Sequence, residues 1–171
     1  WQNPATFTGT AEYPTTVADE AGLVYGYRTD GNIVVFNPMT NAVSYRPTTV
    51  PVLRGSGSLF ETRIAYDPPT RSLYLGAFNT PELYRFDIDT GSTTQLTSIP
   101  EPQLNDIFCG DRSGHLYVAG ADSGMTLFQY DIAADTWNRI PDYPVDHGNN
   151  GSCVVSDAGF LYVSSGSGNE F

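Results

Sequence analysis

The sequence predicts an all-β protein built from four-stranded antiparallel blades of a β-propeller, about three and a half of them in 171 residues. Two sequence features recur along the chain with nearly the same spacing. The first is a tyrosine in a short apolar segment, with copies 49, 43 and 45 residues apart at Tyr25, Tyr74, Tyr117 and Tyr162. The second is an aromatic residue followed by Asp or Asn, with copies 50 and 44 residues apart at Phe36, Phe86 and Tyr130. A period of about 40 to 50 residues is typical of a propeller blade, whereas a β-sandwich, the alternative fold, needs no long repeat.

Each unit is predicted to contain four short strands joined by tight turns. The strands expected in the first unit are 10–18, 23–27, 33–37 and 43–47. Those expected in the second are 60–66, 73–77, 83–87 and 93–97, and those in the third are 106–109, 115–120, 126–131 and 136–140. The fourth unit is expected to contribute 152–156 and 160–164. Turn residues such as Asp30-Gly31-Asn32 supply the positive φ that a tight hairpin needs.

The segments that connect one predicted blade to the next define the boundaries between the units. Because Trp1-Gln2-Asn3-Pro4 resembles the segment from Trp137 to Pro141, residues 1–9 are predicted to be the outer strand of a preceding blade and its crossing. The predicted blades are then 10–55, 56–102 and 103–148, with 149–171 as the inner part of a fourth. Propeller rings typically have 4 to 8 blades. We therefore expect the open blade faces to meet either the remaining blades of the same propeller or a second copy of the chain.

The last third of the chain carries a recognisable pattern. A Tyr130-Asp131 turn is followed by Trp137, a Pro-bearing crossing, the apolar segment 152–155, a turn with Gly159 and then Tyr162. This pattern resembles the kelch repeat, the repeat of propellers of the galactose oxidase type. The paired glycines of that repeat are reduced here to single residues at Gly26, Gly76 and Gly120, and Ser164-Ser165-Gly166 replaces them in the last copy. The turn at 86–91 is also similar to quinoprotein-like propeller repeats.

The charge and the hydrophobicity of the sequence exclude some classes of binding partner. The net charge is −11, and all eight basic residues are scattered arginines. Nucleic acid binding needs clustered cations, so neither nucleic acid nor an anionic membrane surface is expected as a partner. No apolar run approaches the roughly 20 residues of a membrane helix, so no membrane insertion is expected. The acidic, lysine-free surface favours an extracellular or cell-surface protein.

Candidate binding residues lie on the loops predicted to share one rim, the crossings between blades and the turns between second and third strands. Such loops often carry function on rigid scaffolds. The candidates are Arg28, Asp30, Arg54, Glu101, Asp122, Asp146 and His147. In the same loop as His147, Asn150-Gly151-Ser152 is an N-glycosylation triplet.

Metal and cofactor signals are weak. Asp87-Ile88-Asp89-Thr90-Gly91 has the start of a calcium-loop rhythm but lacks a third acidic residue and the closing Glu. Asp87 and Asp89 are therefore candidate Ca²⁺ ligands only, and the alternative is that these side chains cap a turn. No cofactor is predicted. The copper site of galactose-oxidase-like enzymes needs two His ligands, a tyrosine pair and a thioether-forming Cys, and that set cannot be placed on this sequence.

The two cysteines, Cys109 and Cys153, fall in corresponding strands of neighbouring units, offset by one residue relative to Tyr117 and Tyr162. Strand residues alternate between faces, and stacked sheets lie about 10 Å apart. We therefore expect two buried free thiols, with a disulfide as the alternative.

These features favour a non-catalytic scaffold, a kelch-like propeller that recognises a protein or a glycan through its rim loops. No nucleophile elbow, phosphate loop or Cys/His arrangement is found in the sequence. The first alternative is the propeller portion of a secreted carbohydrate-active or oxidase enzyme. The second is a structural subunit of an extracellular assembly, closed by strand exchange.

Overall fold

The protein is all-β. The computed structural model describes residues 15–28, 30–51, 62–77, 80–101, 107–119, 126–142 and 152–164. Within these ranges the chain forms fourteen strands in four antiparallel sheets and no helix, so no helix there could cross a membrane. Three sheets have four strands and the last has two. The predicted three and a half blades of antiparallel strands are thus confirmed, and the arrangement is compatible with a propeller-like fold.

In every sheet the strands lie in chain order. The first sheet contains β1 (Thr16–Ala18), β2 (Val24–Tyr27), β3 (Asn32–Asn37) and β4 (Ala42–Pro47). The second contains β5 (Thr62–Asp67), β6 (Ser72–Ala77), β7 (Tyr84–Asp87) and β8 (Thr93–Gln95). The third contains β9 (Phe108–Gly110), β10 (His115–Ala119), β11 (Leu127–Asp131) and β12 (Thr136–Ile140). The fourth contains β13 (Ser152–Val155) and β14 (Leu161–Ser164).

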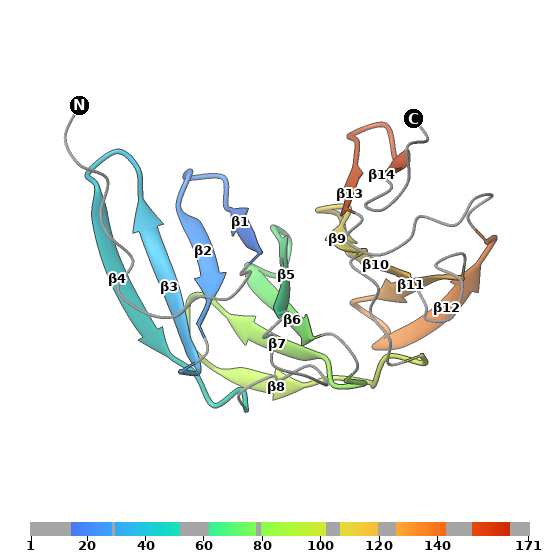
Figure 1. The fold of residues 1–171 in the computed structure, drawn as a ribbon, viewed down its shortest axis with the longest axis horizontal. Coiled ribbons are helices and arrows are strands. Elements are labelled where there is room, and N and C mark those ends of the chain that lie inside the picture. Colours follow the sequence, from blue (N-terminus) through green and yellow to red (C-terminus); the bar gives the residue numbers. More distant parts are fainter. Residues whose placement is uncertain are drawn as a thin grey trace.

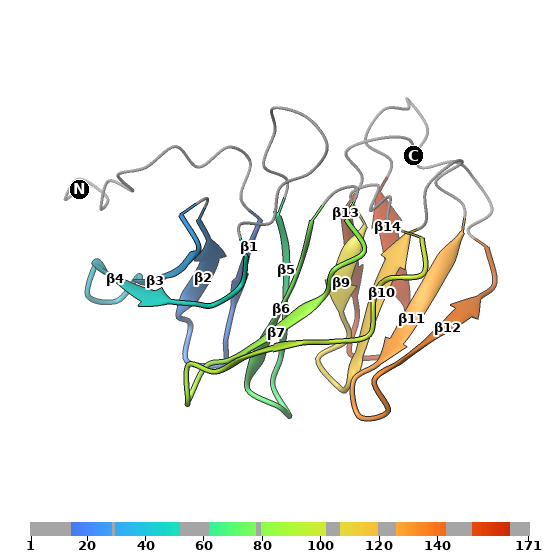
Figure 2. The ribbon, with the colours of Figure 1, turned by 90° about the horizontal axis from the view of Figure 1, so that it is seen from below.

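The four sheets are arranged side by side along an arc, with the first strand of each innermost and β4, β8 and β12 outermost (Figure 1). The inner strands contact one another in succession, β1 with β5, β5 with β9, and β9 with β13. Seen at right angles, the inner strands run roughly parallel through the thickness of the molecule (Figure 2). The inner strands therefore form a common wall on the concave side of the arc.

The turns between third and fourth strands follow one local rule. In each, the first side chain of the turn accepts hydrogen bonds through Oδ1 from the backbone N–H groups two and three residues later; these acceptors are Asn37, Asp87 and Asp131. Four residues after the acceptor, the backbone turns left-handed, at Asn41 (φ 56°), Gly91 (φ 73°) and Asp135 (φ 52°). Asn, Asp and Gly adopt this conformation most readily, which explains why these residue types recur at this spacing.

Side-chain bonds also cap the turns between first and second strands. The Leu23 N–H donates to Asp19 Oδ1 at 2.9 Å, and the His115 N–H donates to Asp111 Oδ1 at 3.0 Å. His115 Nδ1 lies 2.8 Å from Asp111 Oδ2. Burial opposes the charge of Asp111, but the backbone N–H groups of His115 and Ser113 and the imidazole outweigh it and hold the pKa of this carboxyl below its usual value.

The core consists of layers between consecutive sheets. Tyr25 of the first sheet packs in a cluster with Leu73 and Leu75 of the second, and Tyr74 of the second packs in a cluster with Leu116 of the third. Tyr25 is 1% exposed and Tyr74 is 0% exposed. The recurring tyrosine is thus the residue that each sheet directs toward the next one.

In the last sheet, the face that carries the recurring tyrosine is not covered by another sheet among the described residues. Leu161 and Val163 pack back on the third sheet, so Tyr162 between them points the other way. Tyr162 is 58% exposed, and on the same face Val154 is 61% and Phe160 is 65% exposed. We call these three residues the open face.

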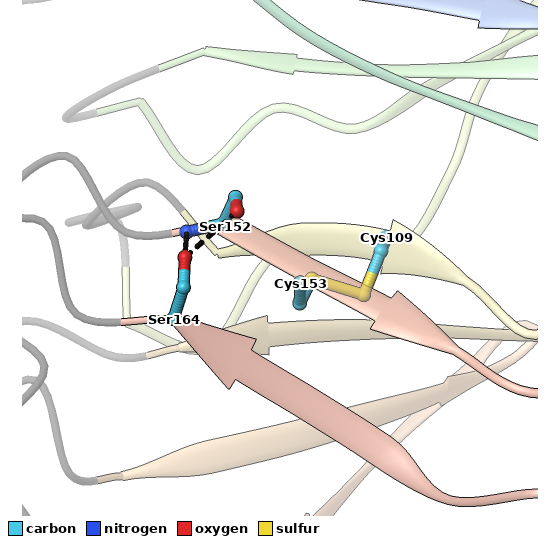
Figure 3. Close-up of a disulfide and its surroundings, with 4 residues drawn as sticks. All are labelled: Cys109, Ser152, Cys153 and Ser164. Atoms are coloured by element: carbon cyan, nitrogen blue, oxygen red, sulfur yellow. Dashed lines mark hydrogen bonds between the residues drawn. A yellow bond between two sulfur atoms is a disulfide. The ribbon is translucent and has the colours of Figure 1, made fainter. Parts of the chain in front are cut away.

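Cys109 and Cys153 form a disulfide with Cα atoms 5.9 Å apart (Figure 3), so the expectation of free thiols is wrong. Cys109 pairs with Tyr117 and points away from the second sheet, whereas Cys153 packs toward the third. The two cysteines therefore lie on the faces that the third and fourth sheets turn toward each other, and their side chains can meet. The spacing of about 10 Å applies to the middle of stacked sheets, but here the inner strands converge.

Candidate functional site

An open groove of about 400 Å³ runs along the concave wall formed by β1, β5, β9 and β13. Its lining also includes Thr15 before β1 and Arg112 in the β9–β10 turn. We call it the inner groove. Its volume lies within the range of small-molecule sites in proteins, roughly 300–1,000 Å³.

Bonds between sheets hold the walls of the inner groove in place. Thr15 Oγ1 donates to the Thr62 carbonyl at 3.0 Å and accepts the Ile64 N–H at 3.0 Å, which joins the first sheet to β5. The Cys109–Cys153 disulfide joins β9 to β13. The groove is therefore framed by strands that are tied together rather than by free loops.

Three side chains from three sheets meet beside the groove. The Tyr66 hydroxyl donates to Glu20 Oε2 at 2.8 Å, and the Arg112 guanidinium lies over the Tyr66 ring at 5.6 Å from its centroid. Arg112 Nη2 is 4.0 Å from Glu20 Oε1, and Nη1 donates to the Ala18 carbonyl at 3.4 Å. Burial and the bond to Glu20 raise the pKa of Tyr66 to about 12. The pKa of Glu20 is lowered by hydrogen bonds from the Glu20 backbone N–H and from the Tyr66 hydroxyl.

The inner groove differs in charge from the chain as a whole. Its charged lining residues are Arg63 on β5 and Arg112, and no Asp or Glu is among the described residues that line it. Two of its hydroxyl groups are bonded within the protein, that of Thr15 to the Thr62 carbonyl and that of Ser152 to Ser164 Oγ at 2.9 Å. The charged side chains that line the inner groove are therefore arginines, in a chain whose net charge is −11.

No protein-family model matches the chain, and a search of the curated proteins finds no match either. The kelch resemblance therefore depends on the residues of this chain and on their contacts. Two of those residues, Tyr130 and Trp137, pack against each other with ring centroids 4.8 Å apart and ring planes inclined by 43°. Trp137 Nε1 also donates to the Thr97 carbonyl at 3.1 Å and so links β12 to the segment that follows β8.

The structure brings two of the predicted rim residues together. Arg28 and Asp30 form an ion pair with a 3.0 Å N–O distance in the β2–β3 turn, and the Arg28 guanidinium lies 4.9 Å from the centroid of the Tyr45 ring. Glu101 lies elsewhere, in the segment after β8. The remaining candidates lie outside the described residues: Arg54, Asp122, Asp146, His147 and Asn150 of the glycosylation triplet.

Asp87 and Asp89, the candidate calcium ligands, are engaged by groups of the protein. Asp87 Oδ1 accepts hydrogen bonds from the backbone N–H groups of Asp89 and Thr90. These bonds, chiefly the one from Thr90, lower the pKa of Asp87. Asp89 forms a two-pronged ion pair with Arg71, at 2.8 and 3.0 Å, and that guanidinium lowers the pKa of Asp89. The part of the chain that the structure describes contains no group of three His, Cys, Asp or Glu that could hold a metal ion.

Arg63 and Arg112 were not among the residues predicted from the sequence. One signal was present for Arg63, which directly precedes the apolar run Ile64-Ala65-Tyr66 of a first strand. Arg112 gave no such signal, because its contact with Tyr66 joins residues 46 positions apart and depends on how the sheets stack.

Proposed function

We propose that this chain is part of a kelch-like β-propeller that binds a glycan or a protein without converting it. The observation that supports this most directly is the inner groove, a site of about 400 Å³ on tied, rigid strands. The contact between the Tyr130 and Trp137 rings supports the kelch-type repeat, because both residues belong to the pattern that carries the resemblance. The rim residues, among them Arg28 and Asp30, are proposed as further contacts for a large ligand.

The proposed location is extracellular or at the cell surface. The Cys109–Cys153 disulfide supports it, since structural disulfides persist in oxidising compartments and are rare in the cytosol.

Titration with a panel of neutral and acidic oligosaccharides, followed by NMR amide shifts, tests the binding function. The expected result is a set of shifts on β1, β5, β9 and β13, or in the β2–β3 turn, with β4, β8 and β12 as the internal control. Chemical conversion of a bound oligosaccharide would contradict a non-catalytic role. Shifts spread evenly over inner and outer strands would contradict a defined site.

The second candidate function is that of a structural subunit that associates with its own copies. The open face favours it, because Val154, Phe160 and Tyr162 are apolar and more than half exposed, and β14 pairs on one side only within the described residues. Exposed apolar faces beside unpaired strand edges promote association. The occupant proposed for the open face is a second copy of this chain.

Sedimentation of the chain over a range of concentrations tests this. The expected result is a dimer or larger species that Tyr162→Asp weakens and Met39→Asp does not. Met39 is a suitable control because it is 88% exposed but lies in the β3–β4 turn, away from the open face. A monomer at all concentrations would exclude this candidate.

A further inference from the structure

We infer that the open face binds the first sheet of a second copy of this chain, so that two copies join head to tail and close a ring. The surface bound is the side of the first sheet that is turned away from the second sheet, which we call the back face. The inference rests on the second candidate function, self-association, and names the surface of the copy that covers the open face.

Contacts between successive sheets always join the same two kinds of face. Tyr25 packs in one cluster with Leu73 and Leu75, which flank the recurring tyrosine of the second sheet. Tyr74 packs in one cluster with Leu116, which directly precedes the recurring tyrosine of the third sheet. The tyrosine-bearing face of one sheet thus meets the opposite face of the next, because neighbouring strand residues point to opposite sides. Two tyrosine-bearing faces do not meet anywhere in the described fold.

This order leaves one unmatched face at each end of the arc that the sheets form (Figure 1). The fourth sheet ends the series with a tyrosine-bearing face, the open face. The first sheet begins the series with the back face, which is the kind of face that meets a tyrosine-bearing face in the rest of the fold. Among the described residues neither end face is covered by another sheet.

The back face is apolar in all four of its strands. Val35 points toward the second sheet, so its neighbour Val34 points away from it, and the strand register extends this face over the sheet. The apolar residues of the back face are Ala18, Val24, Val34, Phe36, Val43 and Tyr45. Val34 is 8% and Tyr45 is 44% exposed. Antiparallel sheets with one face in water alternate apolar and polar residues. The continuous apolar run 33–36 instead indicates a sheet that is covered on both faces.

Val43 occupies a position that already joins two sheets elsewhere in the chain. It pairs with Phe36 of β3, as Trp137 pairs with Tyr130 of β11. Trp137 packs on the cluster between the second and third sheets and donates to the Thr97 carbonyl. By this equivalence, Val43 is directed toward the sheet that covers the back face.

Two copies joined in this way bury both end faces at once. Each copy contributes four described sheets, so two copies bring eight, and propeller rings typically have 4 to 8 blades. A head-to-tail contact closes into a ring when its rotation fits and grows into a filament when it does not. Pairing of two open faces would leave both back faces in water, so the head-to-tail contact accounts for more of the apolar surface.

The test is sedimentation velocity of one variant on each face and of their mixture. Tyr162→Asp changes the open face, and Val43→Asp changes the back face. Each variant alone is expected to weaken the dimer by about tenfold or more, because a buried carboxylate loses its hydration. An equimolar mixture is expected to recover part of the dimer, since the intact back face of one variant meets the intact open face of the other.

Ser44→Asp is the matched control for the back face. Ser44 is exposed and follows Val43 on β4, but it shares the opposite face with Val35, so the dimer is expected to stay unchanged. Tyr45→Asp is a second variant of the back face and is expected to weaken the dimer as Val43→Asp does. If Val43→Asp lowers the melting temperature strongly, Tyr45→Asp and its mixture with Tyr162→Asp decide the question.

Three results would overturn the inference. A dimer that Tyr162→Asp weakens and neither back-face variant weakens would mean that two open faces pair, so self-association stands and the head-to-tail contact fails. A series of species that keeps growing beyond the dimer would show that the contact does not close. A wild-type chain that is monomeric at all concentrations excludes the second candidate function and this inference with it.

Discussion

Cys109 of β9 and Cys153 of β13 are joined across two successive sheets, from the innermost strand of one to the innermost strand of the next. Among the described residues, the fourth sheet has two strands, and its core layer against the third sheet is the smallest of the three such layers. The disulfide is therefore the strongest single link between this sheet and the rest of the described fold.

The first prediction concerns this link. Cys153→Ser is expected to reduce the free energy of unfolding by about 2–5 kcal/mol, because the bond closes a loop of 44 residues and restricts the unfolded chain. Denaturant unfolding with and without a reductant measures the effect. The reductant should destabilise the wild type and leave Cys153→Ser unchanged; a wild type insensitive to reduction contradicts the prediction.

The second prediction compares two equivalent tyrosines. Tyr74→Ala is expected to cost about 3–5 kcal/mol, because Tyr74 is fully buried between two sheets and its loss leaves a cavity. Tyr162→Ala is the matched control at the same position of the last unit and is expected to cost less than about 1 kcal/mol, since the ring is 58% exposed. Chemical denaturation measures both. Similar losses in the two variants would mean that the open face is covered in solution.

The third prediction concerns acid. Because the folded protein holds the pKa of Asp111 below its usual value, ionised Asp111 stabilises the fold above the unfolded pKa of about 3.9. That contribution is lost as the pH falls from about 5 through the lowered pKa. Asp111→Asn is expected to be about 1–2 kcal/mol less stable at pH 7 and to lose less stability than the wild type between pH 5 and pH 2. Urea unfolding across this range is the measurement, and parallel curves for the two proteins would refute the prediction.

The fourth prediction tests calcium at the β7–β8 turn. Millimolar Ca²⁺ is expected to leave the melting temperature unchanged, because Asp87 already accepts two backbone N–H groups and Asp89 is paired with Arg71. Asp89→Ala is expected to leave the melting temperature nearly unchanged, since its ion pair is exposed. A Ca²⁺-dependent rise in melting temperature that Asp89→Ala abolishes would establish a metal site instead.

Local signals in the sequence were sufficient for the strands and turns. The spacing of Tyr25, Tyr74, Tyr117 and Tyr162 predicts four units, and the structure has four sheets; Gly31, in the turn predicted to supply a positive φ, has a φ of 83°. These features depend on neighbours in the chain, so a single sequence reports them. The strand β12 was predicted with the same bounds that the structure shows, 136–140.

Contacts between sheets could not be predicted in the same way. The disulfide was missed because an average sheet spacing was applied to inner strands that converge. The groove was missed because its lining comes from the first strands of four sheets and forms only when those sheets stack. The rim residues were chosen from loop position alone, and of these the structure joins Arg28 and Asp30.

The small core layer behind β13 and β14 has a consequence for the order in which the molecule opens. A segment with few buried neighbours can unfold locally while the remaining sheets stay intact. With the disulfide reduced, backbone amides of β13 and β14 should exchange their hydrogens with solvent far sooner than those of β6, in which every residue is buried.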